Sequence, residues 1–190
     1  MAPEPEAGAI TPAHDDLVFQ IRARAENLYT SRQFLCSEAI LAAMNQGLGG
    51  GLTEDQAVGL AAGLAIGLGD SGCLCGALGG AILAVGLFLG QSKAHRYRRE
   101  IRQAANELHR LFKERHRSTC CRVLSREVKD DPVAHFRQCA NLTGDGAEWA
   151  ARLVLERRPH LAGQAHPDYL ARRDGRWPGR LKWLLRLLGF

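Results

Sequence analysis

The sequence predicts an all-α protein, folded as a compact bundle of short helices. Along most of the chain, apolar residues recur at spacings of three and four, as one face of a helix requires. No segment alternates apolar and polar residues between turn signals, as half-buried strands would. Within the bundle, one helix is expected to be central and rich in Gly and Ala, and another to be long, basic and amphipathic.

The composition is typical of one soluble globular domain with tails. The chain has 190 residues, of which 46% are hydrophobic and 24% charged, so it can bury a core without needing disulfides. The net charge of +5 is unevenly spread. The first residues are acidic and contain no apolar stretch that resembles a secretory signal. We therefore expect a cytoplasmic protein, a setting in which structural disulfides are rare.

The chain is expected to divide into three parts. Residues 1–14 hold three prolines among Ala, Gly and Glu and predict a disordered tail. Residues 15–159 contain the helical periodicity and predict a four-cysteine domain. Residues 160–190 predict a polar linker followed by a basic amphipathic helix.

Three helices are expected at the beginning of the domain. The first follows from the helical spacing of apolar residues over 17–28. A short apolar helix over 34–44 has Cys36 in its first turn and glycines beyond its end. Residues 53–56 have the form of a capping box, which begins a helix that should run to about residue 68.

The central helix is predicted to begin after a turn at residues 69–72 and to end near residue 89. Residues 71–90 contain no charged side chain, and that length could span a bilayer. However, the helix before it is too short to return across a membrane, and the segment is rich in glycine rather than leucine. We therefore favour a buried helix in the bundle, with a membrane span as the alternative.

The longest helix is predicted over residues 93–117, where nine Lys or Arg and three Glu surround one apolar stripe. Such a charged face is usually solvated. Because no DNA-binding motif accompanies it, we expect no specific nucleic-acid partner. Breaks at 130–132 and 144–146 predict further short helices before Pro159, and Cys139 lies in the first of them.

Within the C-terminal segment 176–190, residues 180–188 present a Trp and five Leu on a broad face, with three cations opposite. A basic amphipathic helix of this kind can lie on an anionic membrane, dock on a partner protein or cap its own bundle. The sequence leaves these three alternatives open, including peripheral association of a cytoplasmic protein with a membrane.

The six cysteines are the residues most informative about chemistry. Four are predicted at or near the start of a short helix, where free N–H groups and the helix dipole favour the thiolate: Cys36, Cys75, Cys121 and Cys139. If these helix starts meet at one end of the bundle, they offer the ligands of an iron–sulfur cluster or of structural zinc. Their separations of 39, 46 and 18 residues match no compact metal motif.

Three stretches resemble the redox-active proteins of the C-GCAxxG-C-C type, which are small α-helical proteins with four characteristic cysteines. Residues 75–80 read CGALGG and match the CGAxxG motif of that family. Residues 34–41 are similar to the region of its first cysteine. Residues 118–124 are similar to the region of the third, with Cys121 as the equivalent, and Cys139 resembles the fourth.

This resemblance covers about residues 30–158 and implies a redox role. A related module accompanies haem and iron–sulfur sites in an unusual bacterial cytochrome, which favours an iron–sulfur or a thiol redox role. The family's fixed set of four cysteines favours a cluster with four thiolate ligands: Cys36, Cys75, Cys121 and Cys139. Gly76, Ala77 and Gly80 would pack closely behind this cofactor. A redox partner protein is expected as well. No CxxCH motif is present, so we expect no covalently attached haem.

Other chemistries remain alternatives. Dithiol–disulfide exchange needs only two thiols, and Cys73 with Cys75 offers such a pair, whereas adjacent Cys120 and Cys121 bridge only with strain. Zinc would make the site structural, and buried thiols would be inert. Cys73 and Cys120 depart from the family pattern, and each could substitute for its neighbour as a ligand.

An alternative from another class is a basic helical scaffold that recruits phosphate-bearing or acidic partners through residues 93–117. The seven histidines are scattered along the chain, and each is expected at the surface. None lies beside a nucleophile in a recognisable hydrolase motif, so the sequence supports no hydrolytic activity.

Overall fold

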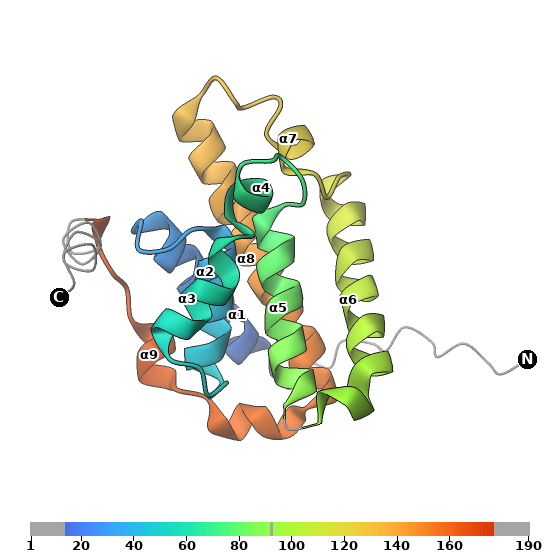
Figure 1. Ribbon diagram of the computed structural model, residues 1–190. Helices are drawn as coiled ribbons and strands as arrows, with labels where there is room; N and C mark the ends of the chain where they lie inside the picture. Colours follow the sequence, from blue (N-terminus) through green and yellow to red (C-terminus); the bar gives the residue numbers. More distant parts are fainter. Residues whose placement is uncertain (1–13, 92, 177–190) are drawn as a thin grey trace, which may run out of the picture.

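The computed structural model describes residues 14–91 and 93–176, and throughout these ranges the chain is helical with no strand (Figure 1). The predicted all-α class is confirmed. In chain order, the elements are α1 (Asp15–Thr30), α2 (Cys36–Gly47), α3 (Glu54–Ala62), α4 (Ala65–Gly69), α5 (Gly76–Gly90), α6 (Ala94–His116), α7 (Cys121–Leu124), α8 (Pro132–Arg157), η2 (Pro159–Gln164) and α9 (Pro167–Ala171).

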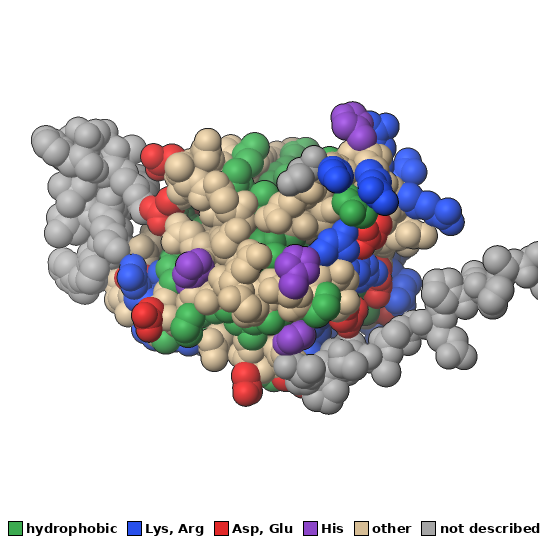
Figure 2. Space-filling model, turned by 90° about the horizontal axis from the view of Figure 1, so that it is seen from below, with side chains coloured by type: hydrophobic (Ala, Val, Ile, Leu, Met, Phe, Trp, Pro, Cys, Tyr) green, Lys and Arg blue, Asp and Glu red, His purple; other side chains and the backbone are tan. Residues whose placement is uncertain are grey.

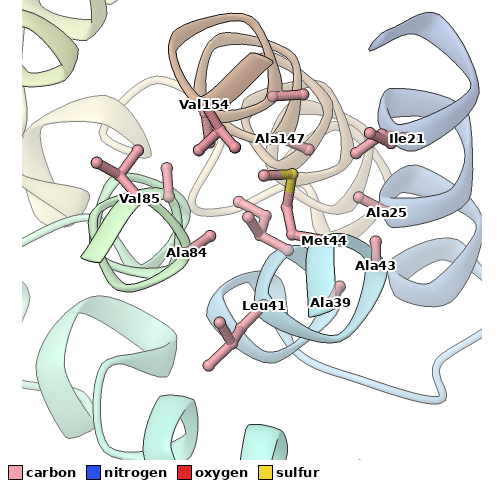
Figure 3. Close-up of a cluster of buried hydrophobic side chains, with 14 of the residues drawn as sticks. Ile21, Ala25, Ala39, Leu41, Ala43, Met44, Ala84, Val85, Ala147 and Val154 are labelled. Carbon is pink, nitrogen blue, oxygen red and sulfur yellow. The ribbon is translucent and has the colours of Figure 1, made fainter. Parts of the chain in front are cut away.

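The core lies between α1, α2, α5 and α8. Figure 3 shows apolar side chains from all four helices meeting there, among them Ile21, Met44, Val85 and Val154, each of which is 0% exposed. Complete burial of such a side chain stabilises the fold by about 1.5–3 kcal/mol. Because each helix contributes an apolar face to one cluster, the relative positions of the four helices are fixed.

Helix α5 occupies the central place predicted for it and packs against α2, α6 and α8. Its contact with α2 is close at Gly80, where an added Cβ would lie 2.6 Å from the backbone oxygen of Ser37. A glycine is therefore needed for this helix spacing. Across the described residues, no helix combines the length and the apolar character needed to cross a membrane.

Helix α8 is a correction to the prediction. Residues 144–146 were expected to break the chain, yet α8 continues through them for 26 residues and is longer than α6, which has 23. Its glycines allow close packing instead: a Cβ at Gly146 would lie 3.0 Å from the carbonyl oxygen of Ala77, and one at Gly144 would collide with Glu26. Packing thus outweighs the helix penalty of about 1 kcal/mol per glycine.

The helix that begins at the predicted capping box also ends earlier than expected. The box itself is confirmed: the N–H of Thr53 donates to Oε1 of Gln56 at 2.9 Å, and the N–H of Gln56 donates to Oγ1 of Thr53 at 3.2 Å. However, α3 ends at Ala62, and after Gly63 and Leu64 the backbone becomes left-handed from Ile66 onward.

Helix α6 has the predicted amphipathic character. Ala104, Leu108 and Phe112 are fully buried along its apolar stripe. Two of its three acidic residues pair with the C-terminal end of α8, where Arg157 binds Glu107 at 2.8 Å and the C-cap Arg158 binds Glu100 at 2.8 Å. In Figure 2, Lys and Arg side chains gather on the side of the molecule where α6 lies. The helix is therefore anchored through its acidic groups and presents its cations to solvent.

The expected polar linker contains two short helices, η2 and α9, that pack on the bundle. Leu161 and Leu170 are buried, and Arg24 binds Asp174 at 2.7 Å. This segment was expected to be a linker because its composition is polar. Its two buried leucines are what pack it on the bundle. The predicted N-terminal tail and C-terminal amphipathic helix lie outside the described residues, at 1–13 and 177–190.

Candidate functional site

Four of the cysteines line one cavity at the end of the bundle where α4 and α7 lie (Figure 1). The cavity has a volume of about 270 Å³, and its thiols come from α2, from the residue before α5, from α7 and from α8: Cys36, Cys75, Cys121 and Cys139. The structure thus brings together the four cysteines that the sequence singled out, although they lie far apart along the chain.

Two of these thiols sit at helix starts, where backbone N–H groups are free to bond them. Cys75 is the N-cap of α5, and the nearby backbone N–H groups of Ala77 and Leu78 lower the pKa of its thiol. Cys36 is the first residue of α2, and its sulfur accepts a hydrogen bond from the backbone N–H of Ile66. Both thiols are therefore positioned by backbone atoms rather than by mobile side chains.

Of the other two thiols, Cys121 also lies at a helix start and Cys139 does not. Cys121 begins the single turn of α7. Cys139 lies well inside α8 rather than at a helix start, because α8 begins at Pro132 and is not interrupted. The prediction that all four thiols lie near helix starts is therefore wrong for Cys139, which projects from the side of a long helix.

Two glycines allow the backbone to approach these sulfurs. A Cβ at Gly76 would lie 2.5 Å from Sγ of Cys36, and a Cβ at Gly67 would lie 2.7 Å from Cβ of Cys121. Among the small residues predicted behind the site, Gly76 therefore touches a cavity thiol directly. Ala77 is fully buried, and Gly80 provides the contact with α2 described above.

The backbone beside the cavity adopts a strained, left-handed conformation. Ile66, Leu68 and Asp70 have φ values of 55°, 57° and 67°, and Gly67 and Gly69 are also left-handed. An L-residue in this region costs about 1–2 kcal/mol, and for a β-branched residue such as Ile66 it is an outlier. The turn directs the Ile66 N–H to Cys36 and places Gly67 beside Cys121. The strained conformation is thus coupled to the site, where such outliers tend to cluster.

Tyr29 is a cavity residue that the sequence analysis missed. It lies in the last turn of α1, lines the cavity, and its hydroxyl donates a hydrogen bond to Sγ of Cys139. Its ring stacks on Phe136 with the centroids 5.0 Å apart. A signal was present in the sequence: Tyr29 follows Ala25 by four residues and so continues the buried face of α1.

Burial controls the acidity of the cavity thiols. Removal from water raises the pKa of Cys75 to about 12 and that of Cys139 to about 11, and it also raises the pKa of Cys36 and of Cys121. The N–H groups at the start of α5 lower the pKa of Cys75, but by less than burial raises it. The expectation that helix starts make these groups thiolates is therefore wrong for the protein alone. Its cavity thiols stay protonated at neutral pH.

Two histidines are not the surface residues that were expected. His135 lines the cavity. The ring of His116 makes tilted contacts with Phe112, with centroids 4.7 Å apart, and with Trp149, at 5.7 Å, and its Nε2 lies 3.1 Å from a carboxylate oxygen of Asp145. Helical spacing on α6 and α8 brings these groups together, which their scattered positions in the sequence did not indicate.

Cys73 and Cys120 do not line the cavity. Cys73 is exposed, and its thiol donates a hydrogen bond to the sulfur of Cys120. The Cys120 thiol donates in turn to the backbone oxygen of Gly72 at 3.0 Å. The two cysteines that depart from the family pattern thus contact each other. Of each neighbouring pair, the cysteine that lines the cavity is Cys75 or Cys121.

The cavity thiols surround a space rather than a point. Within the described ranges, no three His, Cys, Asp or Glu side chains are arranged to hold a single metal ion. The sulfurs are close enough to interact electrostatically, since ionised Cys36 raises the pKa of each of the other three thiols. The arrangement can therefore ligate a group that fills the space between the sulfurs, or exchange electrons between thiols.

The chain was compared with known proteins. Residues 34–153 match the model of a family described as "Putative redox-active protein (C_GCAxxG_C_C)", and the match includes all six cysteines. No curated protein and no solved structure matches the chain.

Proposed function

The chain belongs to this family of redox-active proteins, and from that membership we propose that its four-cysteine cavity holds an iron–sulfur cluster and passes electrons to a partner protein. The observation that carries the proposal is the meeting of four thiols at one cavity: Cys36, Cys75, Cys121 and Cys139. A bound cluster of this kind, held by four thiolates, gains and loses electrons over a wide range of potentials.

The residues present fit such a group. All four donors are soft sulfur atoms, the ligands of iron–sulfur clusters. The cavity volume of about 270 Å³ is many times the roughly 30 Å³ that one water occupies in the liquid, so there is room for more than a single ion. Buried thiols that are protonated in the protein alone lose their protons when a cation binds, because ligation requires the thiolate.

The chain itself supplies three hydrogen-bond sources to these sulfurs. Tyr29 donates to Cys139, Ile66 donates its N–H to Cys36, and the first N–H groups of α5 point to Cys75. Hydrogen bonds to ligand sulfurs stabilise their negative charge and so help to set the reduction potential. Cys75 is only 4% exposed, which limits the access of water to this side of the site.

A second candidate is a dithiol–disulfide redox protein that uses the same cavity. It is favoured by the proximity of Cys36 and Cys75: ionised Cys36 raises the pKa of Cys75 more than any other side chain does. In this case two cavity thiols would oxidise to a disulfide and no metal would be needed.

The proposal is tested by replacing each cysteine with serine and measuring iron per chain after anaerobic purification. Cys36→Ser, Cys75→Ser, Cys121→Ser and Cys139→Ser are each expected to reduce bound iron by roughly tenfold or more, since loss of a ligand costs more than loss of a supporting contact. Cys73→Ser and Cys120→Ser are the matched controls, because they remove a thiol outside the cavity and should retain iron.

Circular dichroism of each variant establishes that a loss of iron is not a loss of helix. Equal iron in the cavity variants and the controls would contradict the cluster proposal. Iron-free protein throughout, with Cys36 and Cys75 linked after mild oxidation, would support the dithiol candidate instead.

A further inference from the structure

At the edge of the cavity, two segments of the chain are held together by backbone hydrogen bonds. The N–H of Cys75 donates to the carbonyl of Thr119 at 2.8 Å, and the N–H of Arg122 donates to the carbonyl of Gly72 at 2.9 Å. Residues 71–75 and 119–122 therefore lie alongside each other in a fixed register. Neither segment depends on a flexible side chain for this contact.

This register brings two further thiols into contact. Cys73 donates a hydrogen bond to Sγ of Cys120, and the Cys120 thiol is itself held by the carbonyl of Gly72 at 3.0 Å. Thiols that hydrogen-bond each other need only a small approach of their sulfurs to reach bonding distance. Cys73 is exposed, so an oxidant in solution can reach it.

A cation lies beside the pair. Nη2 of Arg122 donates to the carbonyl of Ser71 at 2.6 Å, and an added Cβ at Gly72 would lie 2.7 Å from Nε of Arg122. The guanidinium is thus fixed against the backbone that precedes Cys73. Cysteines that react in thiol–disulfide exchange are partly exposed and have positive charge nearby, and this pair meets both conditions.

We propose that Cys73 and Cys120 form a second redox site, a surface dithiol that is oxidised by low-molecular-weight disulfides of the glutathione type. Neither thiol lines the cavity, although each lies within two residues of a thiol that does, and the exchange uses no group bound in the cavity. Its bond would link the segment that carries Cys75 to the segment that carries Cys121, across one side of the cavity.

The exchange is balanced in two steps. The exposed Cys73 thiolate attacks one sulfur of the disulfide R–S–S–R, a Cys73–S–S–R bond forms, and the released R–S⁻ takes up the proton that Cys73 gave up. The Cys120 thiolate then attacks Sγ of Cys73, forms the Cys73–Cys120 bond and releases the second R–S⁻, which takes up the Cys120 proton. The protein loses two electrons and two protons, and the small disulfide becomes two thiols.

The test uses the full chain, incubated with glutathione disulfide and then treated with an alkylating agent under non-reducing conditions. Mass spectrometry of the wild type is expected to show the loss of two hydrogens without a lasting adduct, and a peptide map should link Cys73 to Cys120. Cys120→Ser should instead trap a glutathione adduct on Cys73. Cys73→Ser should react at least about tenfold more slowly, because the accessible thiol is gone.

Two outcomes would overturn the inference: stable glutathione adducts on both cysteines of the wild type, or a bond that joins two cavity cysteines in place of this pair. Iron is measured in the same samples. Iron-free protein that still forms the Cys73–Cys120 bond would count against the cluster and support the surface dithiol, so the two proposals fail separately.

Discussion

Cys75 illustrates how burial sets the chemistry of a single residue. Its sulfur lies at a helix start, beside backbone N–H groups that favour the thiolate. It is also 4% exposed, and the loss of water raises its pKa to about 12. The same residue is therefore positioned as a ligand and unreactive as a free thiol, and a positive group in the cavity would reverse that balance.

Gly80 provides a test of the packing behind the site. Gly80→Ala is expected to lower the free energy of unfolding by about 1–3 kcal/mol, because the new Cβ would meet the backbone of Ser37, which cannot rotate away. Urea unfolding followed by circular dichroism measures the change.

Gly86 is the matched control, since it lies in the same helix and an added Cβ there would meet nothing within 4 Å. Gly86→Ala is expected to raise the free energy of unfolding by about 0.5–1 kcal/mol, because alanine is the better helix former. If both substitutions changed the free energy of unfolding in the same direction, that result would argue against close contact between α5 and α2 at Gly80.

At the scale of elements, the left-handed turn of α4 accounts for much of the geometry of the site. It directs the Ile66 N–H to Cys36 and places Gly67 against Cys121. The side chain of Ile66 is 54% exposed, so the strained backbone is not offset by burial of that side chain. The conformation is held by its surroundings.

Ile66→Gly is expected to raise the free energy of unfolding by about 1 kcal/mol, because glycine adopts this φ without the steric penalty. Leu60→Gly is the comparison: Leu60 is 60% exposed within α3, and there glycine should lower stability by about 1 kcal/mol. Thermal and urea unfolding of both variants measure whether each substitution raises or lowers the free energy of unfolding. Destabilisation by Ile66→Gly would show that the turn is not strained.

Elements whose formation depends on local sequence were predictable, and elements set by tertiary contacts were not. The capping box, the start of α2, the central α5 and the stripe of α6 follow from spacing and capping residues within one segment. The continuity of α8 through Gly144 and Gly146 depends on contacts with α1 and α5. The left-handed α4 likewise depends on contacts with α2 and α7, which no periodicity reveals.

The candidate site divides in the same way. The four cavity cysteines could be identified from the sequence, through their positions and the family resemblance. The role of Tyr29, the position of Cys139 inside a helix and the contact between Cys73 and Cys120 could not, because each depends on how separate elements meet in space.

At the scale of the whole molecule, a network of ion pairs joins α1, α6 and α8. Asp145 is its centre, with Arg22 at 2.5 Å and His116 at 3.1 Å. Burial raises the pKa of Asp145, but the hydrogen bond from Arg22 and the close His116 ring outweigh burial, so its pKa lies below the ordinary value. A carboxylate whose pKa is lower in the folded than in the unfolded state stabilises the fold at pH values above the unfolded-state pKa. That stabilisation is lost as the pH falls through the folded-state pKa.

Asp145→Asn is therefore expected to lower the free energy of unfolding by about 2 kcal/mol at pH 7, the typical contribution of a hydrogen bond to a charged group. The difference in free energy of unfolding between the variant and the wild type should shrink as the pH falls below about 3.9. In this range the Asp145 carboxyl of the wild type binds a proton when the protein unfolds, which favours unfolding. Denaturant unfolding at several pH values measures this. Asp130→Asn, at a side chain that is 89% exposed, is the control and should change stability by less than about 0.5 kcal/mol. A difference at Asp145 that stays constant with pH would contradict the network.

The most direct test of the central claim is the content of iron and acid-labile sulfide in the anaerobically purified chain, together with its visible absorbance. We expect iron and sulfide in comparable amounts and a visible absorbance that decreases on reduction, because four thiols surround one cavity. Colourless, iron-free protein whose cavity thiols oxidise in pairs would contradict the cluster and favour the dithiol candidate. One zinc per chain would contradict both redox functions of the cavity.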